Sequence, residues 1–427
     1  MKDNLTRRTF VKSSAVAATA AAFAPAAWAS AAGRRGVESI NVGVIGCGGR
    51  GTGAAVNALE AHPATRIVAL ADIFADRVDG CYAHLIDQAN FKGRVEVPEE
   101  QRFSGFDAYQ KLLAIKDINY VVLATPPHFR PIHFEAAINA GKHVFMEKPV
   151  AVDPTGVRRV IDASKAADEK GLSVVAGTQR RHQAPYLEMM DRIHNGAIGD
   201  VVSASCYWNQ GGLWDHARRP EYSDMEWQIR NWLYFTWLSG DHICEQHIHN
   251  IDVCNWAFGG PPLKAMGMGG RQVRTDPKYG HIFDHFAIEF EYEGGRKMLS
   301  MCRQIDGCAA RVSEFIQGSR GQASTETGTG VITGENAWKF QGRATNPYVV
   351  EHADLINAMT SGNPLNEGKR VAESTLTAIM GRMSAYSGQE ITFEQAMKST
   401  LDLSPPAYEF GPLPVAPVAV PGKTRFS

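Results

Sequence analysis

The sequence predicts an α/β protein with two domains, the first built on a doubly wound parallel sheet. In the first part of the chain, short β-branched and aliphatic runs alternate with helical stretches, which is the pattern of strand–helix–strand units. Farther on, strand-like runs follow one another without helices between them, which indicates an antiparallel or mixed sheet in a second domain. The length of 427 residues also favours two domains.

Charge and hydropathy argue against two classes of protein. Lys and Arg total 44 and Asp and Glu total 45, so the net charge of −1 offers no basic surface for nucleic acid. The run 15–32 comes nearest to a transmembrane stretch, but it is mostly alanine and is not lipophilic enough to span a bilayer. The seven cysteines form no CxxC pair, so we expect mostly buried thiols.

The first residues have the pattern of an export signal. Arg7 and Arg8 are followed by Phe10 and Lys12, then by the alanine-rich run with small residues suited to cleavage. This pattern resembles a twin-arginine signal, whose export machinery carries proteins that are already folded. We therefore expect residues 1–31 to be removed and the mature protein to be periplasmic or otherwise exported, with no membrane span.

A glycine-rich motif follows the first predicted strand, residues 40–45. The motif is Gly46-Cys47-Gly48-Gly49-Arg50-Gly51, and a helical stretch comes directly after it, which is the context in which G-x-G-x-x-G binds a dinucleotide. Gly46 permits the tight turn, Gly48 lets the backbone approach a pyrophosphate, and Gly51 lets the helix pack on the strand. We expect residues 36–155 to form a Rossmann domain in which Gly46, Gly48, Gly49, Arg50 and Gly51 hold the cofactor.

The end of the second predicted strand indicates which dinucleotide is bound. Asp72 lies 21 residues after Gly51, where a carboxylate can accept hydrogen bonds from both ribose hydroxyls. Ile73 follows it in place of an arginine that would bind a 2′-phosphate, which favours NAD over NADP. Arg50 and Arg77 leave NADP open.

A lysine ends a later strand of the same sheet. The strand around Val144 and Phe145 leads into Glu147-Lys148-Pro149. The carboxyl ends of parallel strands line the crevice where doubly wound sheets bind ligands, so a lysine there is suited to proton transfer. The plainer alternative is a surface lysine before a turn proline.

The second predicted domain, residues 156–403, carries a carboxylate and a histidine at helical spacing. Glu245 and His249 are four residues apart, so on one helix they are neighbours, and the carboxylate would orient the imidazole and raise its basicity. That pair would suit a general base. One alternative is a metal site that adds His242 and His247, but these lie well round the helix from His249 and HExxH is absent, so we expect no metal. Another is a structural histidine.

Aromatic residues gather between residues 207 and 237, where five of the eight tryptophans lie. Flat aromatic faces suit the C–H faces of a sugar ring, and neighbouring polar groups suit its hydroxyls. An aromatic core or a subunit interface is the alternative. The candidate substrate residues are Arg181, Trp208, Trp214 and Asp215. The tail, residues 404–427, holds six prolines, so we expect it to lie extended across the domain or a neighbouring subunit.

Several motifs together resemble the Gfo/Idh/MocA oxidoreductase family, which includes glucose–fructose oxidoreductase and inositol dehydrogenases. The matching segments are the glycine-rich motif, Ala124-Thr-Pro-Pro-His128, residues 140–149 and residues 245–252. The resemblance implies a Rossmann domain, then an α/β domain with a large open sheet that is commonly an oligomer interface, here of a dimer or tetramer. It implies that Lys148 is catalytic, and that the family's Asp-x-x-x-His falls on Glu245 and His249, with Glu replacing Asp. It extends the predicted cofactor site to Thr125, Pro126, His128, Glu147 and Lys148.

The sequence thus favours an exported NAD-dependent oxidoreductase that acts on a secondary alcohol of a sugar, glycoside or cyclitol with a tightly bound nicotinamide. His249, oriented by Glu245, would take the hydroxyl proton, and Lys148 would stabilise the alkoxide. One alternative is a glycoside hydrolase or lyase that uses NAD transiently, although such relatives resemble Glu-Val-Pro where this chain has Glu147-Lys148-Pro149. A third reading is a non-catalytic NAD-bound sensor or scaffold.

Overall fold

The computed structural model describes residues 39–326 and 329–426. The predicted export signal, residues 1–31, lies outside these ranges. Within them, no helix combines the length and the apolar character needed to cross a membrane. All seven cysteines are free, and six of them are buried, as predicted.

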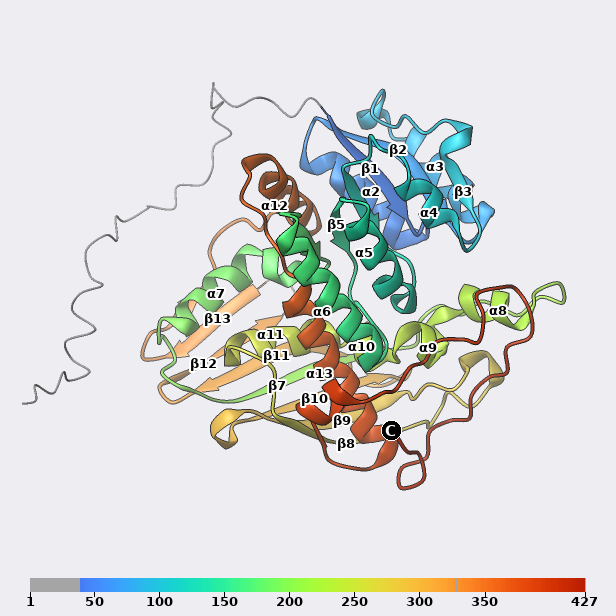
Figure 1. The fold of residues 1–427 in the computed structure, drawn as a ribbon. Helices are drawn as coiled ribbons and strands as arrows, with labels where there is room; N and C mark the ends of the chain where they lie inside the picture. Colours follow the sequence, from blue (N-terminus) through green and yellow to red (C-terminus); the bar gives the residue numbers. More distant parts are fainter. Residues whose placement is uncertain (1–38, 327–328, 427) are drawn as a thin grey trace, which may run out of the picture. The chain divides into compact units, whose positions relative to one another are not determined.

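The first sheet has six parallel strands in the order β3-β2-β1-β4-β5-β6, so the predicted doubly wound parallel sheet is confirmed (Figure 1). The order reverses between β1 and β4, which is where such sheets bind ligands. The predicted boundary between the two domains, at residue 155, falls within this sheet, because strand β6 comes after that residue in the chain. The strands are β1 (Ile40–Ile45), β2 (Thr65–Asp72), β3 (Arg102–Ser104), β4 (Tyr120–Leu123), β5 (His143–Met146) and β6 (Val174–Ala176).

Helices cover both faces of this sheet because its strands are apolar on both sides. Val42, Val44 and Phe145 pack under one group of helices, and Ile45, Val144 and Met146 pack under the other. The first group is α2 (Gly49–Ala61), α3 (Ala75–Ile86) and α12 (Pro347–Ser361), so a helix from late in the chain returns to the nucleotide-binding half. The second group is α4 (Ala108–Leu113), α5 (Arg130–Asn139) and α6 (Pro154–Glu169).

The second sheet has nine strands in the order β14-β13-β12-β11-β7-β10-β9-β8-β15. Strands β7 and β10 pair in parallel and the other neighbours pair antiparallel, so the predicted mixed sheet is confirmed. Its strands are β7 (Val201–Gln210), β8 (Lys264–Gly270), β9 (His285–Glu291), β10 (Lys297–Gln304), β11 (Arg311–Gly318), β12 (Gly321–Glu326), β13 (Thr329–Gly334), β14 (Trp338–Lys339) and β15 (Ile391–Thr392).

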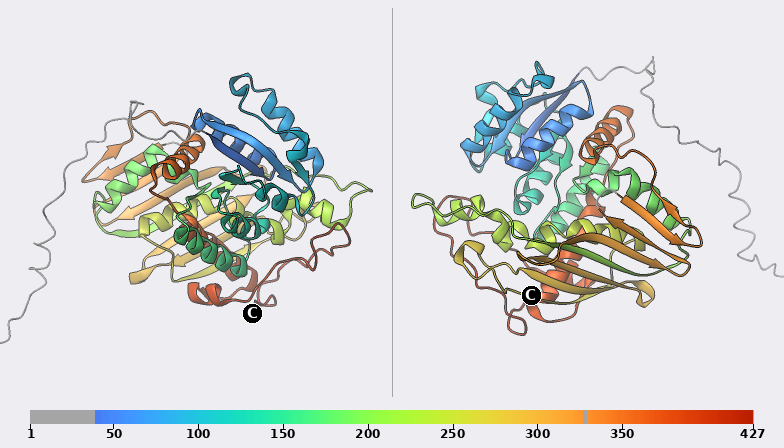
Figure 2. Two further views of the ribbon diagram at one scale, coloured as in Figure 1. Left: turned by 45° about the horizontal axis from the view of Figure 1, so that its top comes forward. Right: turned by 180° about the vertical axis from the view of Figure 1, so that it is seen from behind.

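The two faces of this second sheet differ. Along β10 buried and exposed residues alternate, and the buried face packs under α7 (Ala184–His194), α11 (Ile248–Phe258) and α13 (Gly368–Ser387) (Figures 1 and 2). The other face exposes Met266, Met268, Leu299 and Met301. The chain closes with the short helix α14 (Phe393–Lys398) and a tail that, from residue 404 to 426, has no helix or strand.

Candidate active site

The glycine-rich turn between β1 and α2 has the geometry that a dinucleotide requires. Gly46 has a φ of +97°, and a Cβ on it would lie 2.5 Å from the backbone nitrogen of Thr125. A Cβ on Gly51 would lie 1.7 Å from the carbonyl oxygen of Gly46, so the helix can approach the strand only if this residue is glycine. By contrast, a Cβ on Gly48 or Gly49 would meet nothing within 4 Å. That open space at the start of α2 fits a pyrophosphate.

Asp72 is fixed at the end of β2 by the backbone on either side of the turn. Its carboxylate accepts hydrogen bonds from the amides of Cys47, at 2.7 Å, and Phe74, at 3.0 Å. Burial raises the pKa of the Asp72 carboxyl, and the two amide donors and nearby Arg77 act in the opposite direction. Each oxygen keeps a second lone pair, so the predicted role as acceptor for ribose hydroxyls fits this geometry.

A cavity of about 440 Å³, which we call the cofactor cavity, lies over this turn. Most of the predicted cofactor residues line it, together with Trp214, a predicted substrate residue. The opposite wall is formed by four residues of the second domain that no local sequence pattern assigned to the cofactor: His216, Ile229, Arg230 and Trp232. The full lining is Gly46, Gly48, Gly49, Arg50, Asp72, Ile73, Phe74, Arg77, Ala124, Thr125, Pro126, Trp214, His216, Ile229, Arg230 and Trp232.

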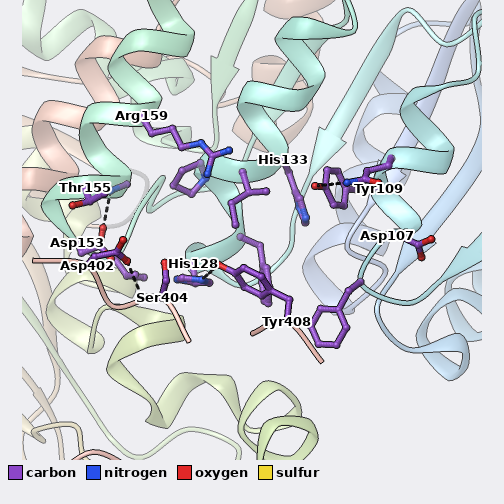
Figure 3. Close-up of a pocket in the computed structure, with 17 residues that line it drawn as sticks. Asp107, Tyr109, His128, His133, Asp153, Thr155, Arg159, Asp402, Ser404 and Tyr408 are labelled. Atoms are coloured by element: carbon purple, nitrogen blue, oxygen red, sulfur yellow. Dashed lines mark hydrogen bonds between the residues drawn. The ribbon is translucent and has the colours of Figure 1, made fainter. Parts of the chain in front are cut away.

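His128 and Glu147, two of the predicted cofactor residues, lie outside this lining. His128 Nε2 lies 2.8 Å from the hydroxyl of Tyr408, beside a separate cavity of about 590 Å³ (Figure 3). Glu147 accepts a hydrogen bond of 2.6 Å from Arg50 Nε. The Arg50 guanidinium also lies 4.9 Å from the ring centroid of Tyr348, so it is already engaged and is a poor candidate for binding a 2′-phosphate.

Lys148 reaches across to the second domain. Its Nζ donates to the carbonyl oxygen of Glu245 at 2.6 Å and lies 3.2 Å from the Oε1 of the same residue. The Lys148–Pro149 peptide bond is cis. Arg50 pairs with Glu147, and Lys148 pairs with Glu245. Four side chains of alternating charge therefore lead from the glycine-rich turn to the second domain. The lysine is therefore a partly buried, paired group, with only 11% of its side chain exposed, and not a surface residue before a turn.

The predicted contact between Glu245 and His249 is not formed. The chain does not continue as one helix here, because α10 (His242–Glu245) ends before α11 begins at Ile248. The Glu245 carboxylate binds Lys148 and, at 2.6 Å, Gln246 Nε2, and no hydrogen bond joins it to His249 in the described part of the chain. The spacing argument failed because it assumed an unbroken helix.

His249 is held by an aromatic neighbour instead of a carboxylate. Its ring stacks on Trp208, with centroids 5.6 Å apart and an interplanar angle of 24°. Burial, followed by the positive charges of Lys148 and Arg180, holds the pKa of His249 well below its usual range, contrary to the predicted rise in basicity. The imidazole is therefore neutral, and its buried Nδ1 has no hydrogen-bond partner among the residues described.

Two predicted substrate residues already have charged partners. Arg181 binds the carboxylate of Asp252 through two nitrogens, at 2.8 and 3.0 Å, and lines a different cavity, of about 220 Å³. Asp215 pairs with Lys278 at 2.9 Å. Both therefore already serve in ion pairs, whereas Trp208 lies beside His249 and Trp214 lines the cofactor cavity.

The histidines around Glu245 do not come together as metal ligands. His242 Nδ1 faces Asp241 Oδ1 at 3.1 Å, and His247 Nε2 lies 2.8 Å from the hydroxyl of Ser300. Over residues 39–326 and 329–426, no group of three or more His, Cys, Asp or Glu side chains is arranged to hold a metal ion.

Two family models match consecutive parts of the chain, and together they match more than half of it. Residues 40–177 match the GFO/IDH/MocA model described as "Oxidoreductase family, NAD-binding Rossmann fold", and residues 186–324 match the GFO/IDH/MocA C-terminal domain.

Individual proteins are similar at lower identity. "Inositol 2-dehydrogenase" of Rubrobacter xylanophilus is 26% identical over 76% of this chain and 84% of its own. A "Glycosyl hydrolase family 109 protein" of Streptomyces niveus is 29% identical over 48% of this chain and 38% of its own. Levoglucosan dehydrogenase, solved with NADH and levoglucosan, has the same fold, with a TM-score of 0.65 and 15% identity over 84% of this chain and 100% of that one. The chain belongs to the GFO/IDH/MocA family of oxidoreductases, with an NAD-binding Rossmann fold followed by the family's C-terminal domain.

Proposed function

We propose that this protein oxidises a secondary hydroxyl of a sugar, glycoside or cyclitol with NAD. The observation that carries the proposal is the partly buried ammonium group of Lys148, which follows β5 and lies close enough to His249 for its charge to lower the pKa of that imidazole. Similarity to an inositol 2-dehydrogenase supports a cyclitol or sugar substrate. In the cofactor cavity, the amides at the start of α2 would hold the pyrophosphate and Asp72 would hold the ribose, and the nicotinamide supplies the hydride acceptor.

The chain's own residues would manage the proton. The Lys148 ammonium donates a hydrogen bond to the substrate oxygen and stabilises the negative charge that develops on it. Neutral His249 would accept the hydroxyl proton, whereas Glu245 is already bound by Lys148 and Gln246. Glu245 then acts by holding Lys148, and not by orienting His249.

A panel of inositols, aldoses and glycosides tests this function. Added to the NAD-loaded protein, at least one of them should produce the absorbance of reduced nicotinamide. Inertness toward every polyol and glycoside would leave the sensor or scaffold as the better reading.

The similarity to a glycosyl hydrolase family 109 protein favours a second candidate, in which NAD is reduced only transiently. In that case a glycoside would be cleaved without net accumulation of reduced nicotinamide, and chromatography of the products would show the freed sugar.

We further propose that the protein is exported by the twin-arginine route with its NAD already bound. The cofactor site and the Arg7-Arg8 pattern support this together, because free NAD is scarce outside the cytoplasm and a freely exchanging enzyme would stop after one turnover. The purified protein should therefore carry NAD(H) that was never added and that survives desalting, as mass spectrometry of the denatured supernatant would show. Protein that purifies empty and needs continuous added NAD would contradict tight binding.

The open face of the second sheet supports a homo-oligomer. Met266 and Met268 are 60% and 77% exposed there, and apolar surface gathered on one face typically marks an interface. Replacing Met268 with lysine would place a charge in that interface, so the dimer or tetramer should dissociate in light scattering. Ile86→Lys, at an exposed position of α3, should leave the mass of the oligomer unchanged. A monomeric wild-type protein would contradict the proposal.

A further inference from the structure

We propose that the C-terminal tail is part of the cofactor site, and that residues 408–413, which we call the tail segment, slow the release of bound dinucleotide. This inference rests on the proposed function, because it gives a structural cause for the tight NAD binding proposed there. Tyr408 and Phe410 of this segment are positioning residues, because they act through the loops that form the cofactor cavity. The family models end at residue 324, well before the tail.

Phe74 is the main point of contact. It lies two residues after Asp72, its amide donates to the Asp72 carboxylate, and it lines the cofactor cavity. The Phe74 ring stacks on Phe410, with centroids 5.8 Å apart and an interplanar angle of 10°. The guanidinium of Arg230, which also lines the cavity, lies 3.8 Å from the centroid of the same ring. The turn that carries the ribose-binding carboxylate is therefore held by a residue of the tail and a residue of the second domain.

The tail segment also contacts the loops after the next two strands. Phe106, just after β3, lies 5.1 Å from Phe410 between ring centroids. The Tyr408 hydroxyl lies 2.8 Å from Nε2 of His128, which follows β4. Figure 3 draws these two side chains next to each other. Two aromatic residues of the tail thus touch all three loops that follow β2, β3 and β4 on this side of the sheet.

The other end of the tail segment is fixed to the second domain. The carbonyl oxygen of Gly411 accepts from the amide of Met225 at 3.1 Å, and that of Leu413 accepts from Gln228 Nε2 at 2.6 Å. Met225 and Gln228 belong to α8 (Asp224–Arg230), the helix that places Ile229 and Arg230 in the wall of the cofactor cavity. The tail segment therefore joins the nucleotide-binding loops to the helix that faces them. Any movement of those two walls away from each other breaks these contacts.

The exposure of the two aromatic residues supports this role over a purely core-forming one. Phe410 is 45% and Tyr408 is 37% exposed, so neither completes a hydrophobic core. Their buried faces are the ones turned toward the cofactor loops. Removing one of them should therefore loosen the loops without unfolding the domain.

The test measures release of NADH directly, by the loss of bound-NADH fluorescence after excess ADP-ribose is added. Phe410→Ala should release NADH about 10-fold faster, which corresponds to the loss of its ring contacts with Phe74 and Phe106. Phe410→Tyr keeps the stacked ring and should restore slow release, and Tyr408→Phe, which removes only the hydroxyl, should give a smaller increase.

Val420→Ala is the matched control, since Val420 is an equally exposed apolar residue of the tail outside the segment. An unchanged release rate in both Phe410→Ala and Tyr408→Phe would overturn the inference. So would an equal acceleration in Val420→Ala, since it would mean that any change in the tail has this effect. Because release is measured without turnover, faster release from Phe410→Ala in a protein that oxidises no polyol would sustain this inference while the proposed function fails. If the variants release NADH at the wild-type rate and the protein is an active dehydrogenase, the proposed function stands and this inference fails.

Discussion

Lys148→Ala is expected to lower kcat about 100-fold or more, the scale of a lost group that acts on the proton and the developing charge. Only 11% of the Lys148 side chain is exposed, so a water molecule would be a poor substitute for its ammonium group in the variant. NAD should still bind, because Lys148 does not line the cofactor cavity. Single-turnover reduction of the bound nicotinamide measures the chemical step separately from cofactor exchange.

Removing Lys148 also leaves Glu245 without its cation, and that loss alone could destabilise the site. The double variant Lys148→Met/Glu245→Gln removes both charges with little change in volume, and it should be equally slow. Lys165→Ala, on the exposed side of α6, should have normal activity. His249→Ala should also cost about 100-fold. Near-normal turnover in both Lys148→Ala and His249→Ala would show that the chemistry lies elsewhere.

Asp72→Ala is expected to weaken NAD binding about 100-fold, because two kinds of hydrogen bond to one charged group are lost. The first is the predicted contact with the ribose hydroxyls. The second is internal, since the amides of Cys47 and Phe74 lose the carboxylate that fixes the turn. Titration of NAD by quenching of tryptophan fluorescence measures the change, because Trp214 and Trp232 lie in the cavity wall.

Asp72→Asn separates the two effects. The amide keeps the shape and one acceptor oxygen, so binding should fall less than in Asp72→Ala. Asp79→Ala, on the exposed face of α3, should bind NAD normally. The same titrations with NADP test the preference for NAD, and a wild-type protein that binds NADP as tightly would contradict the role given to Asp72 and Ile73.

The sequence was sufficient for those features that depend on residues close together along the chain. The alternation of apolar runs with helical stretches predicted the parallel sheet, and Gly46 to Gly51 predicted the turn between β1 and α2. Asp72 was found by its distance from that turn. Strand period, turn chemistry and the need for glycine are decided by local backbone geometry, so a short window of sequence is enough to recognise them.

Tertiary structure decided which side chains meet. The break between α10 and α11 turned Glu245 toward Lys148, 97 residues away, instead of toward His249. Arg50 met Glu147, also 97 residues away, and Tyr408 met His128 across 280 residues. The second-domain wall of the cofactor cavity is likewise formed by residues that lie far from the glycine-rich turn along the chain. Such contacts depend on how whole helices and sheets pack. A charged side chain with several possible partners pairs with the one that packing brings within about 3 Å, and no local sequence pattern determines which partner that is.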